Sequence, residues 1–133
     1  MILDSSAVVA ILRAEPEAPV MAQAMDCAEA CGISAVGYVE AAIVIDSSRD
    51  PIATRRFDDF FRESGIAIEA VTLRQAQIAR EAYRDFGKGR HQAGLNFGDC
   101  FAYALAKDKG EPLLFKGNDF RHTDIEPCED LSG

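Results

Sequence analysis

The stretch MILDSSAVVAIL (residues 1–12) holds a single charged side chain, Asp4, between two apolar runs. Residues 1–3 are typical of a short buried strand, and Ser5 and Ser6 are suited to cap a helix directly after it. In an open α/β sheet, ligands bind beyond the carboxyl ends of the strands. This opening therefore predicts a β–α unit with an acid at the functional edge of the sheet.

The same alternation of short apolar strands and helices continues along the chain. Such alternation is typical of an α/β protein in which helices cover both faces of a mainly parallel central sheet. The expected strands are residues 1–3, 32–34, 66–71 and 112–115. The expected helices are residues 5–13, a segment containing Met21 and Met25, 35–48, a segment opening at Pro51, 73–86 and 97–109, with Gly87 and Gly110 ending the last two.

The composition indicates one folded domain spanning residues 1–133, because 48% of the side chains are hydrophobic. A net charge of −8 is unusual for a nucleic-acid-binding protein, although ten of the 14 basic residues are arginine, which grips phosphate well. No stretch is apolar and long enough for a membrane span, and no secretory leader is visible. We therefore expect a cytoplasmic protein whose four cysteines are reduced thiols.

Four acids stand in apolar surroundings. Asp4, Glu40 and Asp99 are each the only charged residue in a long apolar stretch, and Asp119 follows the run PLLFKGN. An ionised carboxylate in such surroundings is costly unless a cation or hydrogen bonds compensate it. Asp4 and Asp119 follow strands, and Glu40 and Asp99 lie on helices that could overhang the same edge. The sequence thus predicts one acidic pocket for a hard divalent cation, Mg²⁺ or Mn²⁺.

Each acid also has a simpler interpretation. Asp4 could only cap the first helix, and Asp99 could only interact with the dipole of its helix. Asp119 could be an ordinary turn residue in GND, and Glu40 could lie on a narrow solvated strip of its helix. The expected placement of all four at one edge is what favours a shared metal site.

Over its whole length the chain resembles the PIN-domain ribonucleases, and most closely the VapC toxins of bacterial toxin–antitoxin pairs. The matching segments are MILDSSAVVAIL, SAVGYVEA, LNFGDCFAYALA and LLFKGNDFRHTDI, in this order. The resemblance implies a three-layer α/β/α fold, Mg²⁺ or Mn²⁺ as cofactor, and RNA as substrate. It also implies a homodimer and a VapB-like antitoxin, through which DNA would be contacted only indirectly.

The resemblance further suggests roles for individual residues. The family's acidic positions correspond to Asp4, Glu40, Asp99 and Asp119, which we expect to be catalytic. Asp4 and Asp99 are expected to bind the metal directly, whereas Glu40 and Asp119 could bind it directly or hold its waters or a second ion. Asp124, in TDI, is a further acid that could lie in or near the pocket.

Other polar residues have less definite roles. Ser6 and Asn96 could orient a water or a phosphate oxygen, or only cap helices. Two basic clusters could hold the RNA backbone or form solvated loops: Lys88, Arg90 and His91, and Lys116, Arg121 and His122. Surface ion pairs are expected for Arg55, Arg56 and Arg62. The expected dimer contacts lie on the helices that contain Val8, Val9 and Leu12, and Tyr38, Ala42 and Ile45.

The sequence thus favours a metal-dependent endoribonuclease toxin. A non-catalytic PIN-like module that acts through complex formation with a DNA-binding partner is the main alternative. A receiver-type phosphoacceptor domain is a poorer match, because no second acid accompanies Asp4 and the run IAIEAV does not end in Asp.

Overall fold

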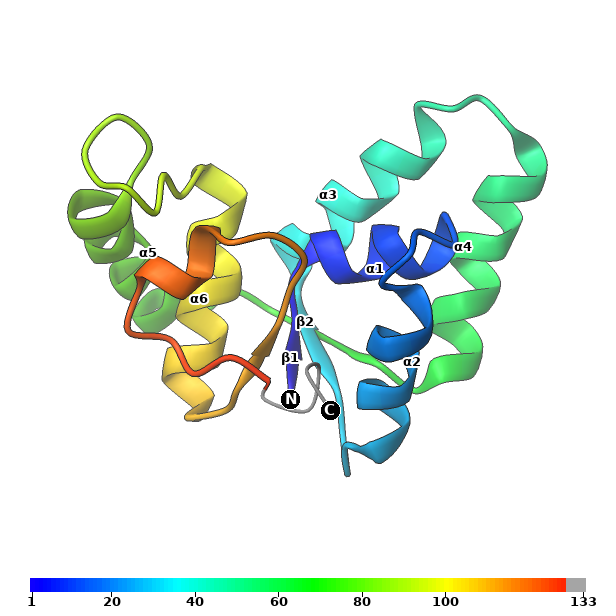
Figure 1. The fold of residues 1–133 in the computed structure, drawn as a ribbon, viewed down its shortest axis with the longest axis horizontal. Coiled ribbons are helices and arrows are strands. Elements are labelled where there is room, and N and C mark those ends of the chain that lie inside the picture. The colour runs from blue at the N-terminus through cyan, green and yellow to red at the C-terminus, as the bar shows by residue number, and fades with distance from the viewer. Residues whose placement is uncertain (129–133) are drawn as a thin grey trace.

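In the computed structural model, which describes residues 1–128, a four-stranded parallel sheet separates two layers of helices (Figure 1). The sheet has the order β3-β2-β1-β4, and all neighbouring strands are parallel. The α/β class and the three-layer arrangement are therefore confirmed. The strands are β1 (Ile2–Leu3), β2 (Gly32–Ser34), β3 (Ala67–Glu69) and β4 (Leu113–Leu114).

Four helices lie on one side of the sheet and two on the other (Figure 1). For the four helices whose two ends were both predicted, each end agrees with the structure to within two residues. The first layer contains α1 (Ser5–Leu12), α2 (Ala18–Cys27), α3 (Ala35–Asp46) and α4 (Pro51–Ser64), the second contains α5 (Leu73–Phe86) and α6 (Phe97–Lys109), and a 3₁₀ helix η1 (Asp119–His122) follows β4.

Each face of the sheet has its own hydrophobic core. Ile2 and Leu113 belong to the core beneath α5 and α6, whereas Leu3 and Leu114 belong to the core beneath α1 to α4. Successive strand residues point to opposite faces, and here both faces are covered. This is why β1 and β4 consist of consecutive apolar residues instead of alternating with polar ones.

The edge strand β3 is shorter than predicted. The alternating run at residues 66–71 suggested a six-residue strand, but β3 pairs only with the three residues of β2. Ile66 is buried, whereas Ile68 is 48% exposed because β3 lies at the edge of the sheet. The apolar positions in this segment therefore do not all face a core.

Two helix ends correct or refine the sequence-based expectation. The N-cap of α1 is Asp4, whose Oδ2 accepts a hydrogen bond from the backbone N–H of Ser6 (3.0 Å), and not Ser5 or Ser6. Gly87 does end α5, but with a φ of −70°. Glycine is needed there because a Cβ would collide with the backbone carbonyl oxygen of Tyr83.

Within the described residues, no helix combines the length and apolarity that crossing a membrane requires. The four cysteines are free thiols, as expected.

Leu105 on α6 provides a direct test of the core. Its side chain is fully buried, so Leu105→Ala should lower the free energy of unfolding by about 3 kcal/mol through lost burial and the cavity left behind. Ile52→Ala is the control, because Ile52 on α4 is 65% exposed and the variant should lose less than about 0.5 kcal/mol. Urea denaturation of both variants measures the difference, and equal losses would contradict this core assignment.

Candidate metal centre

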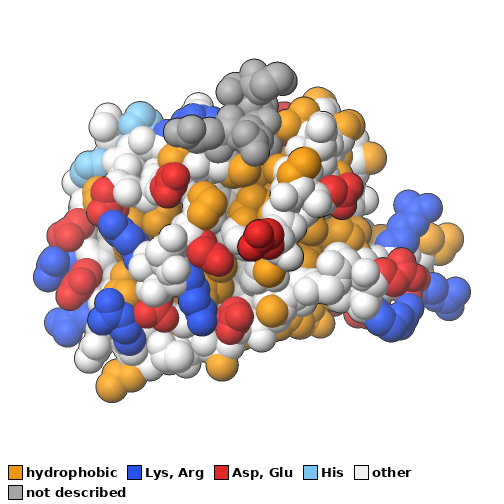
Figure 2. Space-filling model, turned by 90° about the horizontal axis from the view of Figure 1, so that it is seen from below, with side chains coloured by type: hydrophobic (Ala, Val, Ile, Leu, Met, Phe, Trp, Pro, Cys, Tyr) orange, Lys and Arg blue, Asp and Glu red, His pale blue; other side chains and the backbone are white. Residues whose placement is uncertain are grey.

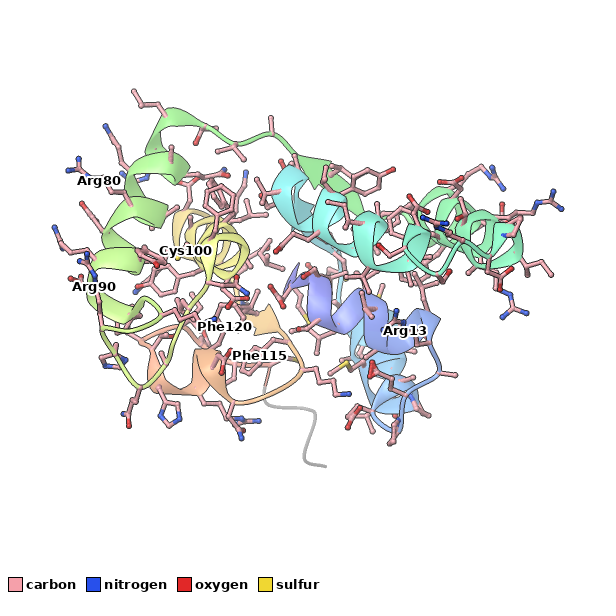
Figure 3. The ribbon with its side chains drawn as sticks, turned by 90° about the horizontal axis from the view of Figure 1, so that it is seen from above. Arg13, Arg80, Arg90, Cys100, Phe115 and Phe120 are labelled. Carbon is pink, nitrogen blue, oxygen red and sulfur yellow. The ribbon has the colours of Figure 1, made fainter. Side chains whose placement is uncertain are left out.

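The four predicted acids come together at the carboxyl edge of the sheet, the end of the molecule seen in Figure 3. Asp4 follows β1, Glu40 lies on α3, Asp99 is in the first turn of α6, and Asp119 is the first residue of η1. Their charges act on one another, since Asp4 and Asp99 raise the pKa of Glu40 and Asp119 raises that of Asp99. The structure therefore places all four in one electrostatic neighbourhood.

Asp4 is the most buried member, with 3% of its surface exposed. While Oδ2 caps α1, Oδ1 is buried and has no hydrogen-bond partner within residues 1–128. Burial is the main reason that the pKa of Asp4 is raised, and the charge of Asp119 adds to it. A buried acceptor without a partner is destabilising, and a bound cation would supply the missing interaction.

Glu40 is half-buried and faces the start of α6. Its Oε1 accepts a hydrogen bond from the Ser5 hydroxyl (3.5 Å). Burial, followed by the charges of Asp4 and Asp99, raises its pKa to about 7. A Cβ at Gly98 would collide with the Glu40 carboxylate, so a glycine at this position lets the carboxylate approach the helix.

Asp99 serves as both a cap and a pocket acid. Its Oδ2 accepts from the backbone N–H of Asn96 (3.0 Å), and Asn96 Oδ1 accepts from the N–H of Asp99 (2.9 Å), which forms a capping box. Burial outweighs this hydrogen bond and, with the charges of Asp4 and Asp119, raises the pKa of Asp99 to about 6. One carboxylate oxygen of Asp99 is not used in this capping box, whereas Oδ1 of Asn96 is used as the cap.

Asp119 is exposed, and Ser6 anchors the segment that leads to it. The Ser6 hydroxyl accepts a hydrogen bond from the backbone N–H of Lys116 (3.0 Å), directly after β4. The triplet Asp4-Ser5-Ser6 therefore contributes one acid, orients a second and anchors the segment of a third. The sequence showed two hydroxyls beside Asp4, but their partners are 35 and 110 residues away in the chain, and no local pattern reveals them.

Several other predicted site residues are engaged elsewhere. Asp124 lies outside the pocket, where its carboxylate contacts Tyr103 and Lys107. Lys116 Nζ binds Glu15 (2.5 Å) and Glu17 (3.4 Å), and His91 Nδ1 accepts from the backbone N–H of Ala93. The remaining members of the two basic clusters are exposed: Lys88, Arg90, Arg121 and His122.

The predicted surface ion pairs are only partly present. Arg62 pairs with Asp59 on α4, as expected. Arg55 and Arg56 have no ion pair within the described residues, so the prediction for them was wrong. At the end of the molecule that lies away from the pocket, acidic and basic side chains are intermixed on the side formed by α5 (Figure 2). The carboxylates of the pocket instead lie beside one another.

The donor set suits a hard divalent cation, although it is not closed into a coordination shell. Among residues 1–128, no group of three or more His, Cys, Asp or Glu side chains is already arranged to hold a metal ion. Mutual repulsion keeps like charges apart, and a cation would draw them together. All donors are carboxylate oxygens and Asp4 Oδ1 lacks a partner, so the residues fit Mg²⁺ or Mn²⁺.

Comparisons with known proteins agree with this geometry. The family model described as PIN domain matches residues 1–126. Ribonuclease VapC28 of Mycobacterium tuberculosis is 52% identical over 131 residues, covering 98% of each chain. The crystal structure of M. tuberculosis VapC20, described as a Sarcin-Ricin loop cleaving toxin, superposes with a TM-score of 0.73 at 15% identity, covering 95% of this chain and 98% of that one. A toxin–antitoxin complex from Klebsiella pneumoniae gives a TM-score of 0.69 at 15% identity and 92% coverage of both chains.

The raised pKa values predict how stability depends on pH without metal. The pKa values of Glu40 (about 7, ordinarily 4.5) and Asp99 (about 6, ordinarily 3.8) are higher in the folded than in the unfolded chain. Protonation therefore favours folding, and this contribution is lost as pH rises from about 4 to about 7. Because both groups are partly hydrated, we expect the loss to be about 1–2 kcal/mol.

Urea denaturation in EDTA at several pH values, compared between wild type and the double variant Glu40→Gln/Asp99→Asn, isolates this contribution. The variant should gain stability relative to wild type as pH rises toward 7. A constant difference across this range would contradict the proposed repulsion.

Proposed function

The chain belongs to the PIN-domain family and, within it, to the VapC ribonucleases, and we propose that it is a toxin that cleaves RNA at its carboxylate pocket with a divalent metal ion. The observation that carries this proposal is the buried Oδ1 of Asp4, which has no hydrogen-bond partner among residues 1–128 and lies near Glu40 and Asp99, whose pKa values are raised. The identity of 52% with Ribonuclease VapC28 favours cleavage over a surface used only for assembly.

Asp4 and Asp99 are proposed as direct ligands, because each has one carboxylate oxygen that is not used in helix capping. Glu40 and Asp119 complete the negative pocket, either as ligands or by holding water molecules around the ion. When bound, Mg²⁺ or Mn²⁺ lowers the pKa of water and stabilises charge that develops on the phosphate.

Glu40 is the proposed proton acceptor. Its pKa of about 7 without metal is close to the operating pH, and a nearby cation would favour its carboxylate form. The Ser5 hydroxyl orients the carboxylate by donating to Oε1, which leaves Oε2 to take a proton from the attacking water. The exposed Arg121 and His122, next to Asp119, are the proposed contacts for the RNA backbone.

We propose a homodimer, but through different residues from those first considered. Val8 and Ile45 are buried in the core, and Tyr38 packs against Phe57 and Phe61, so the originally expected faces are unsuitable. The proposed interface instead uses apolar side chains along the side of the molecule formed by α3, β3 and the start of α5 and α6 (Figure 3). These exposed residues are Val39, Ile43, Ile68, Leu73 and Phe97.

The proposed partner is a VapB-like antitoxin that carries a basic residue into the acidic pocket. The similar structure from Klebsiella pneumoniae is a toxin–antitoxin complex. A guanidinium or ammonium group could pair with the carboxylates in place of the metal. Contact with DNA would then be indirect, through the antitoxin, and the RNA substrate would place the activity in the cytoplasm.

The metal assignment is tested by calorimetry with Mn²⁺ and by cleavage of RNA. Asp4→Asn and Asp99→Asn should each weaken Mn²⁺ binding at least tenfold and abolish cleavage while the fold is retained, because Asn keeps the shape but loses the charge. Asp46→Asn, at the exposed end of α3, is the matched control. Cleavage at the wild-type rate by either pocket variant would rule out the assigned roles.

The inhibition mechanism is tested with the purified complex of the chain and its antitoxin. The complex should bind Mn²⁺ weakly, and replacing the basic residue of the antitoxin tail with Ala should restore binding without dissociating the complex. A fully inhibited complex that retains the metal affinity of the free chain would contradict this mechanism and leave the ribonuclease assignment intact.

A further inference from the structure

The segment that carries Asp119 is attached to the domain on both sides. Before η1, the backbone N–H of Lys116 binds the Ser6 hydroxyl. After η1, the Asp124 carboxylate meets two side chains of α6. Its Oδ1 accepts from the Tyr103 hydroxyl (2.5 Å), and its Oδ2 lies 2.7 Å from Lys107 Nζ. Both carboxylate oxygens of Asp124 are therefore occupied by side chains of α6, which does not favour Asp124 as a metal ligand.

The two contacts of Asp124 differ in strength. Tyr103 is buried, with 6% of its surface exposed, and a short hydrogen bond from a hydroxyl to a carboxylate is among the stronger kinds. The Lys107 and Asp124 side chains are 38% and 56% exposed, and ion pairs in water contribute little. The hydroxyl of Tyr103 is therefore the stronger of the two contacts of Asp124, and it acts beside the burial of Phe120 in the core.

The spacing along α6 links this attachment to the pocket. Asp99, Tyr103 and Lys107 are four residues apart, so they follow one stripe of the helix, each about 6 Å further along the axis. Figure 1 shows the chain that leaves η1 beside α6. One helix thus carries a pocket acid at its start and the attachment for the segment of a second acid one and two turns later.

We propose that Asp124 is a positioning residue: held by Tyr103 and Lys107, it fixes the segment of Asp119 relative to Asp99 and so sets the affinity of the pocket for its metal. This proposal rests on the metal-dependent function proposed above. It assigns a role to an acid that lies outside the pocket, and it assigns to α6 the task of fixing the distance between two pocket acids.

Two variants remove the attachment, and each has a matched control. Tyr103→Phe deletes one oxygen, and Tyr83→Phe on α5 deletes the same atom from a tyrosine that is 40% exposed. Asp124→Ala removes the carboxylate that follows η1. Its control, Asp108→Ala, removes a carboxylate on α6 that binds Arg74 (2.8 Å) and Gln75 (3.3 Å) and not the η1 segment. The controls report the cost of losing a hydroxyl or an ion pair without loosening Asp119.

The first readout is amide hydrogen exchange without metal. In Tyr103→Phe and Asp124→Ala, the amides of Arg121 and Thr123 should exchange about tenfold faster than in wild type, and the two controls should leave them unchanged. Unchanged exchange in both variants would overturn the proposal, because the segment would then be held without Asp124.

The second readout is Mn²⁺ affinity by calorimetry. Both variants should weaken binding about fivefold, but neither should weaken it further in an Asp119→Asn background, because Asp124 acts through Asp119. Wild-type affinity in both variants would overturn the proposal, as would a loss that adds to that of Asp119→Asn, which would identify a direct ligand. If wild type itself binds no Mn²⁺, the proposed metal function fails, and the exchange experiment alone decides whether Asp124 positions the segment.

Discussion

The burial of one carboxylate, Asp4, governs the arrangement of the functional end of this protein. A charge placed at the end of the central strand β1 is tolerable only where hydrogen bonds and a counter-charge can be provided. The start of α1 supplies a backbone N–H to one oxygen. The other oxygen has no hydrogen-bond partner in the described part of the chain, and the remaining acids come toward it from α3, α6 and η1. Burial and the neighbouring charges together raise the pKa values of Asp4, Glu40 and Asp99.

The supports of the pocket are as informative as the acids themselves. Two hydroxyls, a glycine and a capping asparagine hold the carboxylates without adding charge. These groups leave the net negative charge of the pocket undiminished, whereas a lysine or arginine in their place would neutralise part of it. Neutral supports are therefore compatible with the divalent-cation site proposed above.

Sequence patterns predicted the sheet, the helices and the position of the four acids at one edge of the sheet, because each of these depends on local features. The apolar runs, the helix caps and the isolated charges can each be recognised from about a dozen neighbouring residues, as around Asp4 and Asp99. The contacts of Asp124 and Lys116 could not be predicted in this way, since Tyr103 and Glu15 lie far away in the chain. The exposed face of α3 was misjudged because that helix is apolar on nearly all sides, and only packing decides which side is covered.

The strand order has a consequence for when the pocket can exist. β1, formed by residues 2 and 3, lies between β2 and β4, and β4 is synthesised after the other three strands of this sheet. Asp119 follows β4, so a growing chain cannot assemble the pocket until most of its 133 residues have been made. A nascent chain that ends before Asp119 lacks one of the four acids of the proposed site. The proposed ribonuclease site can therefore form only after translation has passed β4 and η1.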